Sequence, residues 1–495
     1  MNLFLIMHFL KKLFFFLYGN LRRYRIYFYI MKFLLNFKLK NNYRINVVYD
    51  NSSNYKEIVY DFSDINLNKK SFEFYDSREL KFKKYRLNYL FEFHPTKLLI
   101  SYSAEKDINH NLQSFKRLDT YSLSELLVNY LFIHSLNSIP IDNKLLAKCY
   151  LRINARLEFH AFGQTNNHFL RNIIAVLVSS IAINDKKTFT KHSNYLSFFI
   201  SNYFSKSGLL KYEKSTNYQS LFLKWQLQIV YIFNYYRIKT DYTDFFISNI
   251  SKHLANFLNV LKFQINIGDL TPDVNSVDLY NSLIILSNSI LISSNENSFF
   301  DQVSGHGMIY FQNKSIVYFI QEIYPYKSSH GHSPSMNYVL NKNGQNLVSD
   351  LGRLNYSKEF NFQTNANNHN AVYFIEGCKT IFLDYVYSNS SDDCICFKSK
   401  SLPNLSSSSN FRILNLIDGF SLNYEINLTK PARMFIILII AKAAKYQYLG
   451  GLRQVNSDEI NSAIDYGIYG DTYYRLIFES SDISLSYNFT INILK

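Results

Sequence analysis

The stretch "SSHGHSPSMNYVLNKNGQNLVSDLG", residues 328–352, joins a histidine pair to the pattern of a β-hairpin. Asn343-Gly344 is a strong signal for a two-residue turn, and the residues on both sides of it are typical of strands. In extended backbone, side chains at positions i and i+2 point to the same face. We therefore expect His330 and His332 to stand side by side, where they could bind one metal, serve one substrate, or divide these roles.

The chain that follows position 295 repeats the short, alternating pattern of this hairpin. Segments such as "GMIYFQNKSIVYFIQEI", "AVYFIEGCKTIFLDYVYS" and "RMFIILII" are typical of strands, and no helical pattern separates them. Many short strands without intervening helices predict an antiparallel β-sandwich. We assign this β-sandwich domain to residues 296–495.

Upstream, from about residue 120 to 290, the apolar residues follow helical spacing, as in "SLSELLVNYLFIHSL" and "NHFLRNIIAVLVSSIAI". Short polar breaks between such segments suggest antiparallel helical hairpins, stacked as a bundle or closed as a ring. We assign a helical domain to residues 61–295 and a basic segment, packed on the body, to residues 1–60. The fold class is therefore α+β and multidomain.

The chain of 495 residues is long for one hydrophobic core, and its net charge is +15. Much of this charge lies in the segment before Asp50, and that segment contains no acidic residue. A basic surface favours a polyanion, which means nucleic acid, acidic lipid or acidic polysaccharide. No nucleic-acid-binding motif accompanies the charge, so we expect no nucleic-acid partner.

The N-terminal stretch "MNLFLIMHFLKKLFFFLYGNLRRYRIYF" is a poor match to a signal peptide or a spanning helix. It lacks basic residues before the apolar run, Lys11 and Lys12 interrupt that run, and no small-x-small cleavage site follows. A basic amphipathic helix fits better, either packed on the body or in peripheral contact with an anionic membrane. We therefore expect no transmembrane segment.

The cysteines are too few for a disulfide framework. Cys394 and Cys396 form a CxC pair, which is a weak metal signal. On a strand, such a pair is more often two core residues that face the same way.

Two polar clusters in the helical part mark helix starts. In "EFHAFGQTNNHFLRN", Asn166 or Asn167 is a natural N-cap, and His168 follows in the first turn. In "GLLKYEKSTNYQ", Tyr218 begins another helix. Taken alone, the first cluster predicts a capped helix with a half-buried histidine, and the second predicts a packed tyrosine or a surface hydroxyl.

A third cluster belongs to the β part. His332, Asp350 and His369 are residue types that suit Zn²⁺. They form no local motif, so the alternative is a histidine pair that is satisfied beside the hairpin without a metal.

Together and in this order, "NNHFLRN", "E-x-STNYQ", "GHGMIYF", the histidine-pair hairpin and "HNAV" resemble the heparinase II/III-like polysaccharide lyases. That superfamily includes heparin, alginate and oligoalginate lyases, and related proteins of capsule and lipopolysaccharide gene clusters. The resemblance extends over roughly residues 85–480. It implies an incomplete α/α toroid over residues 61–295, followed by the antiparallel β-sandwich.

The resemblance also implies β-elimination, in which the C5 proton of a uronic acid is removed and the 4-O leaving group is expelled. A proton next to a carboxylate is very weakly acidic, because the dianion that its loss creates is unstable. The site must therefore neutralise the carboxylate with hydrogen-bond donors or cations, and it must supply a base and an acid.

Each matching residue receives a role from the resemblance. Asn167 would hold and neutralise the carboxylate, and His168 would assist it or act as base. Tyr218 would be the general acid and, in some members, also the base. Because an unperturbed tyrosine has a pKa of about 10, the basic role needs a positive charge nearby. His330 would orient the substrate or take the proton.

The same resemblance implies a structural Zn²⁺ held by His332, Asp350 and His369, which would fix the position of His330. One histidine of the pair would then face the substrate while the other holds the metal. The sequence departs from the family at Pro334, where an Asp usually follows H-x-H, at Gln219, where a His is common, and in "DLG", which replaces "DPG". Tyr356 lies where a second catalytic tyrosine is expected, but a strand aromatic is an equal alternative.

These observations predict a lyase that acts on an acidic polysaccharide, such as a capsular or envelope glycan. Two alternatives stay open: a uronate C5-epimerase, which shares the first step, and a non-catalytic glycan-binding protein that keeps the cleft. Members of the family commonly work in the periplasm or cell envelope, and the poor signal peptide leaves the cytoplasm as the alternative location.

Overall fold

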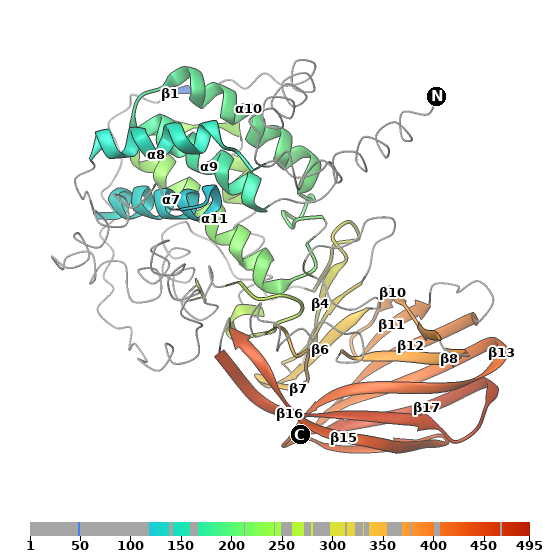
Figure 1. Cartoon of the computed structure of the whole chain (residues 1–495). Helices are drawn as coiled ribbons and strands as arrows, with labels where there is room; N and C mark the ends of the chain where they lie inside the picture. The colour runs from blue at the N-terminus through green and yellow to red at the C-terminus, as the bar shows by residue number, and fades with distance from the viewer. Residues whose placement is uncertain are drawn as a thin grey trace, which may run out of the picture. The chain divides into compact units, whose positions relative to one another are not determined.

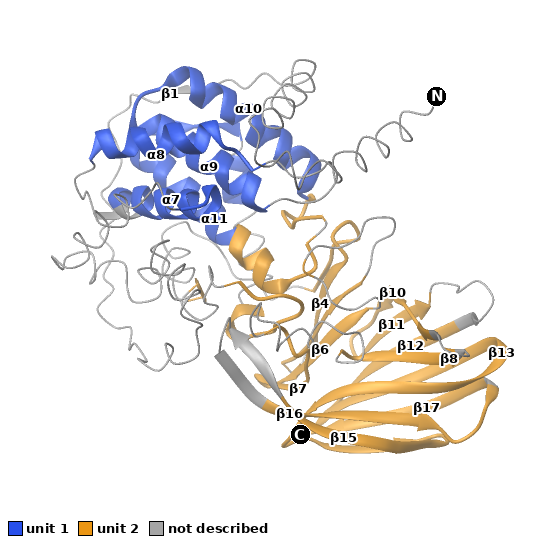
Figure 2. Ribbon diagram, in the orientation of Figure 1, with its two compact units in different colours: residues 1–204, 223–250 blue, residues 205–222, 251–495 orange. Residues whose placement is uncertain are grey.

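The chain is described by a computed structural model and divides into two compact units, residues 1–204 with 223–250 and residues 205–222 with 251–495 (Figure 2). The structure describes residues 48–49, 118–137, 142–158, 167–211, 213–241, 243–248, 260–271, 279–280, 298–311, 314–321, 330, 336–353, 369–376, 379–399, 406–465 and 468–495.

The described helices are long and lie mainly in the first unit (Figure 1). They are α7 (Thr120–Asn137), α8 (Asn143–Ala155), α9 (Asn167–Ala182), α10 (Lys186–Tyr203) and α11 (Thr216–Tyr235), with a short pair formed by β1 (Val48–Tyr49) and β2 (Ile238–Lys239). Residues 216–222 of α11 are grouped with the second unit. The described helices do not by themselves trace a toroid, so the toroid stays a prediction.

Helix α9 is the centre of the first unit. Its residues from Leu170 to Ser180 are all buried, and it packs against α7, α8 and α10. A helix that is covered on every side must be central. Side chains of Asp142 and Asp185 cap the starts of α8 and α10, by accepting hydrogen bonds from backbone N–H groups of the first turn.

The second unit contains a large antiparallel sheet (Figure 1). Its strands are β3 (Phe299–Phe300), β4 (His306–Phe311), β5 (Ser315–Ile320), β6 (Asn337–Lys342), β7 (Gln345–Val348), β8 (Ala371–Glu376), β9 (Lys379–Phe382), β10 (Tyr385–Ser390), β11 (Cys394–Ser399), β12 (Ser406–Leu416), β13 (Gly419–Ala441), β14 (Lys445–Leu449), β15 (Leu452–Asp465), β16 (Ile468–Ser480) and β17 (Ser484–Leu494).

The long strand β13 connects two layers of this sheet. Its first half pairs with β12 and β17, and its second half pairs with β16 on one side and with β8 and β7 on the other. The register with β17 shifts between Asn427 and Ala432, which marks where the strand passes from one layer to the other.

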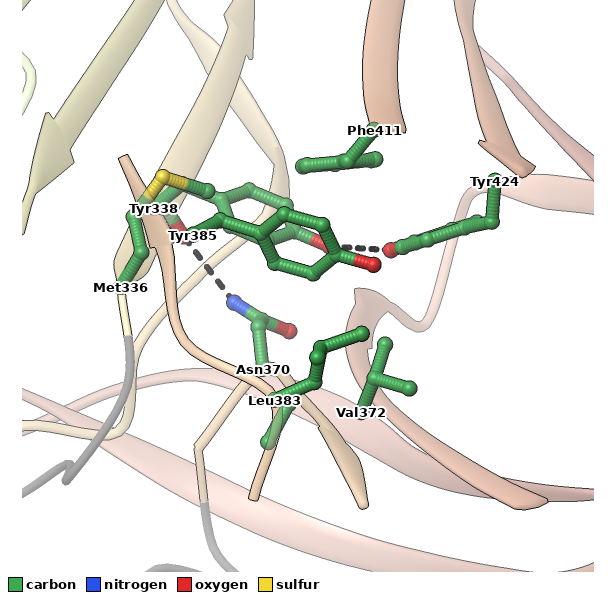
Figure 3. Close-up of a pocket in the computed structure, with 9 residues that line it drawn as sticks. Met336, Tyr338, Asn370, Val372, Leu383, Tyr385, Phe411 and Tyr424 are labelled. Atoms are coloured by element: carbon green, nitrogen blue, oxygen red, sulfur yellow. Dashed lines mark hydrogen bonds between the residues drawn. The ribbon is translucent and has the colours of Figure 1, made fainter. Parts of the chain in front are cut away.

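Aromatic side chains from both layers meet in one apolar core. The ring of Phe319 on β5 lies edge-on to that of Phe397 on β11, with centroids 5.1 Å apart. In the same core, the hydroxyl groups of Tyr338, Tyr385 and Tyr424 point toward one another (Figure 3). The strands thus enclose a core between two layers, and the antiparallel β part of the predicted fold is confirmed.

The hairpin predicted at Asn343-Gly344 is present. β6 and β7 pair through Lys342 and Gln345, and both turn residues have positive φ, 50° and 85°. These angles belong to the two-residue turn that favours Asn-Gly. The N–H of Gly344 also donates to Asn341 Oδ1 at 3.0 Å.

The domain boundaries predicted at residues 60 and 295 stay predictions. The second compact unit contains residues 205–222 and 251–295 in addition to the strands. The basic N-terminal segment lies outside the described residues, apart from the two of β1. None of the described helices is long and apolar enough to cross a membrane.

Candidate active site

Two of the predicted catalytic residues lie face to face within the second unit. Tyr218 is in the first turn of α11 and is 6% exposed. Its ring is stacked on the imidazole of His330, with centroids 3.7 Å apart and an angle of 8° between the planes. The structure therefore brings together a phenol and an imidazole from segments that are far apart in the sequence.

Tyr218 is fixed by the way α11 begins. Ser215 is the N-cap residue: its Oγ accepts a hydrogen bond from the N–H of Tyr218 at 3.0 Å and donates one to the carbonyl of Asp269 at 2.6 Å. The N–H of Thr216 donates to the carbonyl of Ile267 at 3.1 Å. The start of the helix is thus tied to residues 267–269, and the tyrosine inherits that fixed position.

His330 is held by a buried carboxylate. Its Nδ1 lies 2.8 Å from Oε2 of Glu213, whose side chain is 1% exposed, while that of His330 is 22% exposed. The other oxygen of Glu213 accepts the N–H of Ser215 at 3.0 Å. Burial alone would lower the pKa of His330, but the charge and hydrogen bond of Glu213, with the charge of Asp269, outweigh it and raise that pKa above its ordinary value. The imidazole therefore keeps its proton to higher pH than a free histidine.

The backbone of His330 adopts a conformation that L-residues seldom use, with φ of 57°. Its carbonyl accepts the N–H of Asp269 at 2.9 Å. Gly268, with φ of 85°, lies against the same carbonyl, and a Cβ at this position would be 2.5 Å from it. Only glycine fits there. Such strained residues persist where the surrounding structure determines them, and they cluster at functional sites.

Gln219, which replaces the family's common histidine, has a structural role. Its Oε1 accepts the N–H of Leu210 at 3.0 Å, and its Nε2 donates to the carbonyls of Leu210 at 3.0 Å and Glu213 at 3.2 Å. The side chain therefore holds the turn that presents Glu213 to His330.

His306 and Lys214 anchor the same turn to strands β4 and β5. Nε2 of the buried His306 lies 2.7 Å from the carbonyl of Glu213 and must donate, because a carbonyl only accepts. Its Nδ1 lies 2.6 Å from the hydroxyl of Tyr318. Nζ of Lys214 donates to the carbonyls of Ser304 at 2.6 Å and Gln321 at 2.7 Å.

The other two predicted catalytic residues belong to the first unit. α9 begins at Asn167, whose Oδ1 accepts the N–H of His168 at 3.0 Å. Nδ1 of His168 lies 2.7 Å from Oε2 of Glu158, and the ring is stacked on that of Tyr121 with centroids 4.1 Å apart. The side chain of His168 is 39% exposed, and an approach of Asn167 and His168 to the residues of the second unit stays a prediction.

Both predicted catalytic histidines are thus held in the same manner, with Nδ1 on a glutamate and one face on a tyrosine. The glutamates were missed as site residues in the sequence. A signal for Glu213 exists, since it stands two residues before the N-cap of the helix that carries Tyr218. Glu158 gives no comparable signal, because only the fold brings it to His168.

Two of the three predicted metal ligands are neighbours in the second unit. Nδ1 of His369 lies 2.6 Å from Oδ2 of Asp350, and both side chains are fully buried. Asn337 Nδ2 donates to the same oxygen, and the N–H of Gly352 donates to Oδ1 at 2.8 Å. His332 lies outside the described residues, and those that are described contain no cluster of three or more His, Cys, Asp or Glu suited to a metal. A buried imidazole held by a carboxylate is a donor set that fits Zn²⁺.

No protein-family model and no curated protein matches this sequence. Among solved structures, the chain is similar to a heparinase III gene product, with a TM-score of 0.57 and 12% identity over 78% of this chain and 69% of that one. It is also similar to a heparan sulfate lyase from Pedobacter heparinus, with a TM-score of 0.53 and 12% identity over 83% and 72% of the two chains. A further heparinase III structure gives a TM-score of 0.56 and 11% identity over 79% and 74%. The chain therefore has the fold of these polysaccharide lyases.

Proposed function

We propose that this protein is a polysaccharide lyase that cleaves a uronic-acid-containing glycan by β-elimination. The observation that carries the proposal is the stacked pair of Tyr218 and His330, held by the buried Glu213, in a chain with the fold of heparinase III. The net charge of +15 favours a polyanionic substrate.

Within the stacked pair, we assign proton transfer to Tyr218 and charge stabilisation to His330. Glu213 raises the pKa of His330 and so favours its protonated form, and a protonated imidazole has no lone pair with which to take another proton. Its positive charge lies against the phenol and stabilises negative charge on the phenol oxygen. This is the neighbouring charge that a tyrosine needs if it is to act as a base.

In this assignment, Tyr218 carries out both proton transfers of the elimination, removal of the C5 proton and protonation of the leaving oxygen. The oxygen of Tyr218 takes the proton from C5, the electron pair of the broken C–H bond forms the C4–C5 double bond, and the C4–O bond breaks. The leaving oxygen takes a proton from Tyr218, which is thereby ready for another turnover. Asn167 and His168 have the task of binding the carboxylate, whose growing charge must be neutralised in the transition state.

The proposal includes a structural Zn²⁺ at His332, Asp350 and His369. The ion would brace the segment that follows His330, and its chemistry here is to hold ligands in place. Asp350 and His369 are already paired and buried, so the position of the third ligand decides whether the site closes.

The polymer that we propose is an acidic capsular or envelope glycan, encountered in the periplasm or cell envelope. Two other activities would suit the same residues. A C5-epimerase would return the proton to the carbon, and a binding protein would hold the polymer without chemistry. The substitutions at Gln219 and Pro334 favour the binding protein, although Gln219 has a structural role that is compatible with catalysis.

One experiment separates the three. The protein is incubated with a panel of uronate polymers, and the ultraviolet absorbance of the unsaturated uronate is followed. A lyase raises the absorbance, and Tyr218→Phe abolishes the rise while the control Tyr446→Phe, on β14, retains it. An epimerase leaves the absorbance flat but exchanges solvent deuterium into C5. Retention of the polymer with neither signal identifies a binding protein and overturns the proposal.

A further inference from the structure

The cysteine pair of β11 faces away from the core of the second unit. Along this strand Ile395 and Phe397 are buried, whereas Cys394 and Cys396 are partly exposed. The two cysteines share a face, as the core reading of the pair required, but that face is not the core, so the core position is wrong. Both side chains therefore belong to the outer face of the sheet, and each residue is partly exposed to solvent.

The two sulfur atoms are 3.7 Å apart. A divalent ion bound tetrahedrally by thiolates has metal–sulfur distances of about 2.3 Å. Two ligands at the tetrahedral angle are then separated by ~3.8 Å, which is the separation found here within a tenth of an ångström. The thiols of Cys394 and Cys396 are spaced as two ligands of one such ion without any movement of the backbone.

A disulfide between the same residues fits the strand less well. Two residues apart on a strand, the Cα atoms are separated by about 6.7 Å, at the upper end of the ~4.4–6.8 Å that disulfides span. β11 is paired on both sides, with β10 and with β12, so it resists the bending that a shorter separation requires. The geometry therefore favours an ion held between two thiols over a bond between them.

The charge around the pair is also compatible with a cation. Arg412 is the cross-strand neighbour of Cys396 on β12, and its guanidinium lies 3.1 Å from Glu425. The carboxylate offsets the positive charge of the arginine. The neighbour on the other side, Asn389 on β10, is exposed and carries an amide oxygen that can act as a further donor.

We propose that Cys394 and Cys396 bind one soft divalent cation, such as Cd²⁺ or Zn²⁺, between their sulfur atoms. Each thiol loses its proton to solvent as the metal–sulfur bond forms, so the bound unit of two thiolates and one dication is neutral. Solvent and the amide oxygen of Asn389 complete the coordination, because the described residues offer no third His, Cys, Asp or Glu that would complete a metal site. This site shares no residue with the proposed catalytic machinery or with the proposed Zn²⁺ site.

Cadmium titration of the full-length, reduced protein tests the proposal. The readout is the ultraviolet charge-transfer band of a cadmium–thiolate bond, which an ion on histidine and carboxylate does not give. We expect the band to saturate at one Cd²⁺ per chain, and to be abolished by Cys394→Ser and by Cys396→Ser. Cys149→Ser is the matched control and should retain the band, because Cys149 is buried in α8.

The result that overturns the proposal is a flat titration of the reduced protein, or a band that survives either serine substitution. A loss of two mass units from the tryptic peptide containing both cysteines, in protein kept with air as the oxidant, would show that the pair closes as a disulfide. In that case β11 bends enough to bring the two Cα atoms together, and the proposed ion site is contradicted.

Discussion

The imidazole of His330 lies parallel to the ring of Tyr218, with centroids 3.7 Å apart, while its Nδ1 contacts Glu213 at 2.8 Å. The tyrosine is set by the N-terminus of α11, and the histidine is set by a buried carboxylate from the preceding turn. A shift of the His330 ring would break its contact with Glu213, and a shift of the Tyr218 backbone would break the hydrogen bond from its N–H to Ser215 Oγ. The pair is thus preorganised, which is what a site needs if it is to stabilise charge only in the transition state.

Glu213→Gln should reduce activity more than binding. The amide keeps the size of the side chain but removes the negative charge that raises the pKa of His330. We expect kcat for uronate polymer cleavage to fall by ~100-fold, in the range seen when one electrostatic stabiliser of developing charge is removed, with polymer retention unchanged. Glu425→Gln, on the outer face of the β unit, is the control. An unchanged kcat in Glu213→Gln would show that the negative charge of Glu213 does not contribute to catalysis.

Gly268→Ala tests the backbone of His330. The new Cβ would meet the carbonyl of His330 at 2.5 Å, in a residue with φ of 85°. We expect a loss of ~1–3 kcal/mol in the free energy of unfolding, together with a loss of activity. Gly344→Ala is the matched control: it has the same φ, but its nearest contact is 3.4 Å. Chemical denaturation should show the smaller loss for Gly344→Ala, and equal losses would mean that the contact with His330 is unimportant.

The tyrosine cluster in the core predicts that removing different hydroxyl groups affects the stability of the protein differently. Tyr385 Oη is buried and has no hydrogen-bond partner within the described part of the chain, whereas the hydroxyls of Tyr338 and Tyr424 are 3.2 Å apart (Figure 3). Removing an unsatisfied hydroxyl should leave stability unchanged or raise it, and removing a hydrogen-bonded one should cost ~1 kcal/mol. We therefore expect Tyr385→Phe to unfold at the same or higher denaturant concentration than wild type, and Tyr424→Phe at a lower one. A loss of stability in Tyr385→Phe would indicate that an internal water binds the hydroxyl.

Asp301 predicts an acid dependence of stability. Burial alone would raise its pKa, but hydrogen bonds from Ser205 and from the N–H groups of Ser304 and Val303 outweigh burial and lower it. A carboxyl whose pKa is lowered by folding stabilises the protein above its unfolded value of 3.8, and this contribution is lost as pH falls through the folded value. Asp301→Asn keeps an acceptor for the turn. Its deficit in unfolding free energy, measured by urea denaturation, should be constant at neutral pH and shrink below about pH 3.8.

Metal content separates the two proposed metal sites. Protein purified with Zn²⁺ present should lose one equivalent in His332→Ala and in His369→Ala, as measured by atomic emission. The loss should also lower activity, because the ion is proposed to brace His330. The double variant Cys394→Ser/Cys396→Ser is the comparison: it should lose the zinc bound at the dithiol but keep full activity, because the dithiol does not contact His330. Full zinc content in His369→Ala would contradict the ligand assignment.

The sequence by itself determined the local features of this protein. Asn343-Gly344 specified its hairpin because few residues other than Asn and Gly adopt positive φ at both turn positions, and the period of apolar residues distinguished the helices from the strands after position 295. The ordered motifs also selected Tyr218 and His330 before any contact between them was visible.

Only the tertiary structure decided which side chains meet. The place of Glu213 before the N-cap marks it in the sequence, but its contact with His330, and the bonds by which Gln219 holds its turn, exist only because the fold brings these segments together. The outward orientation of Cys394 and Cys396 likewise depended on which face of β11 the second layer covers, since alternation alone fixes that two residues share a face but not which face is buried.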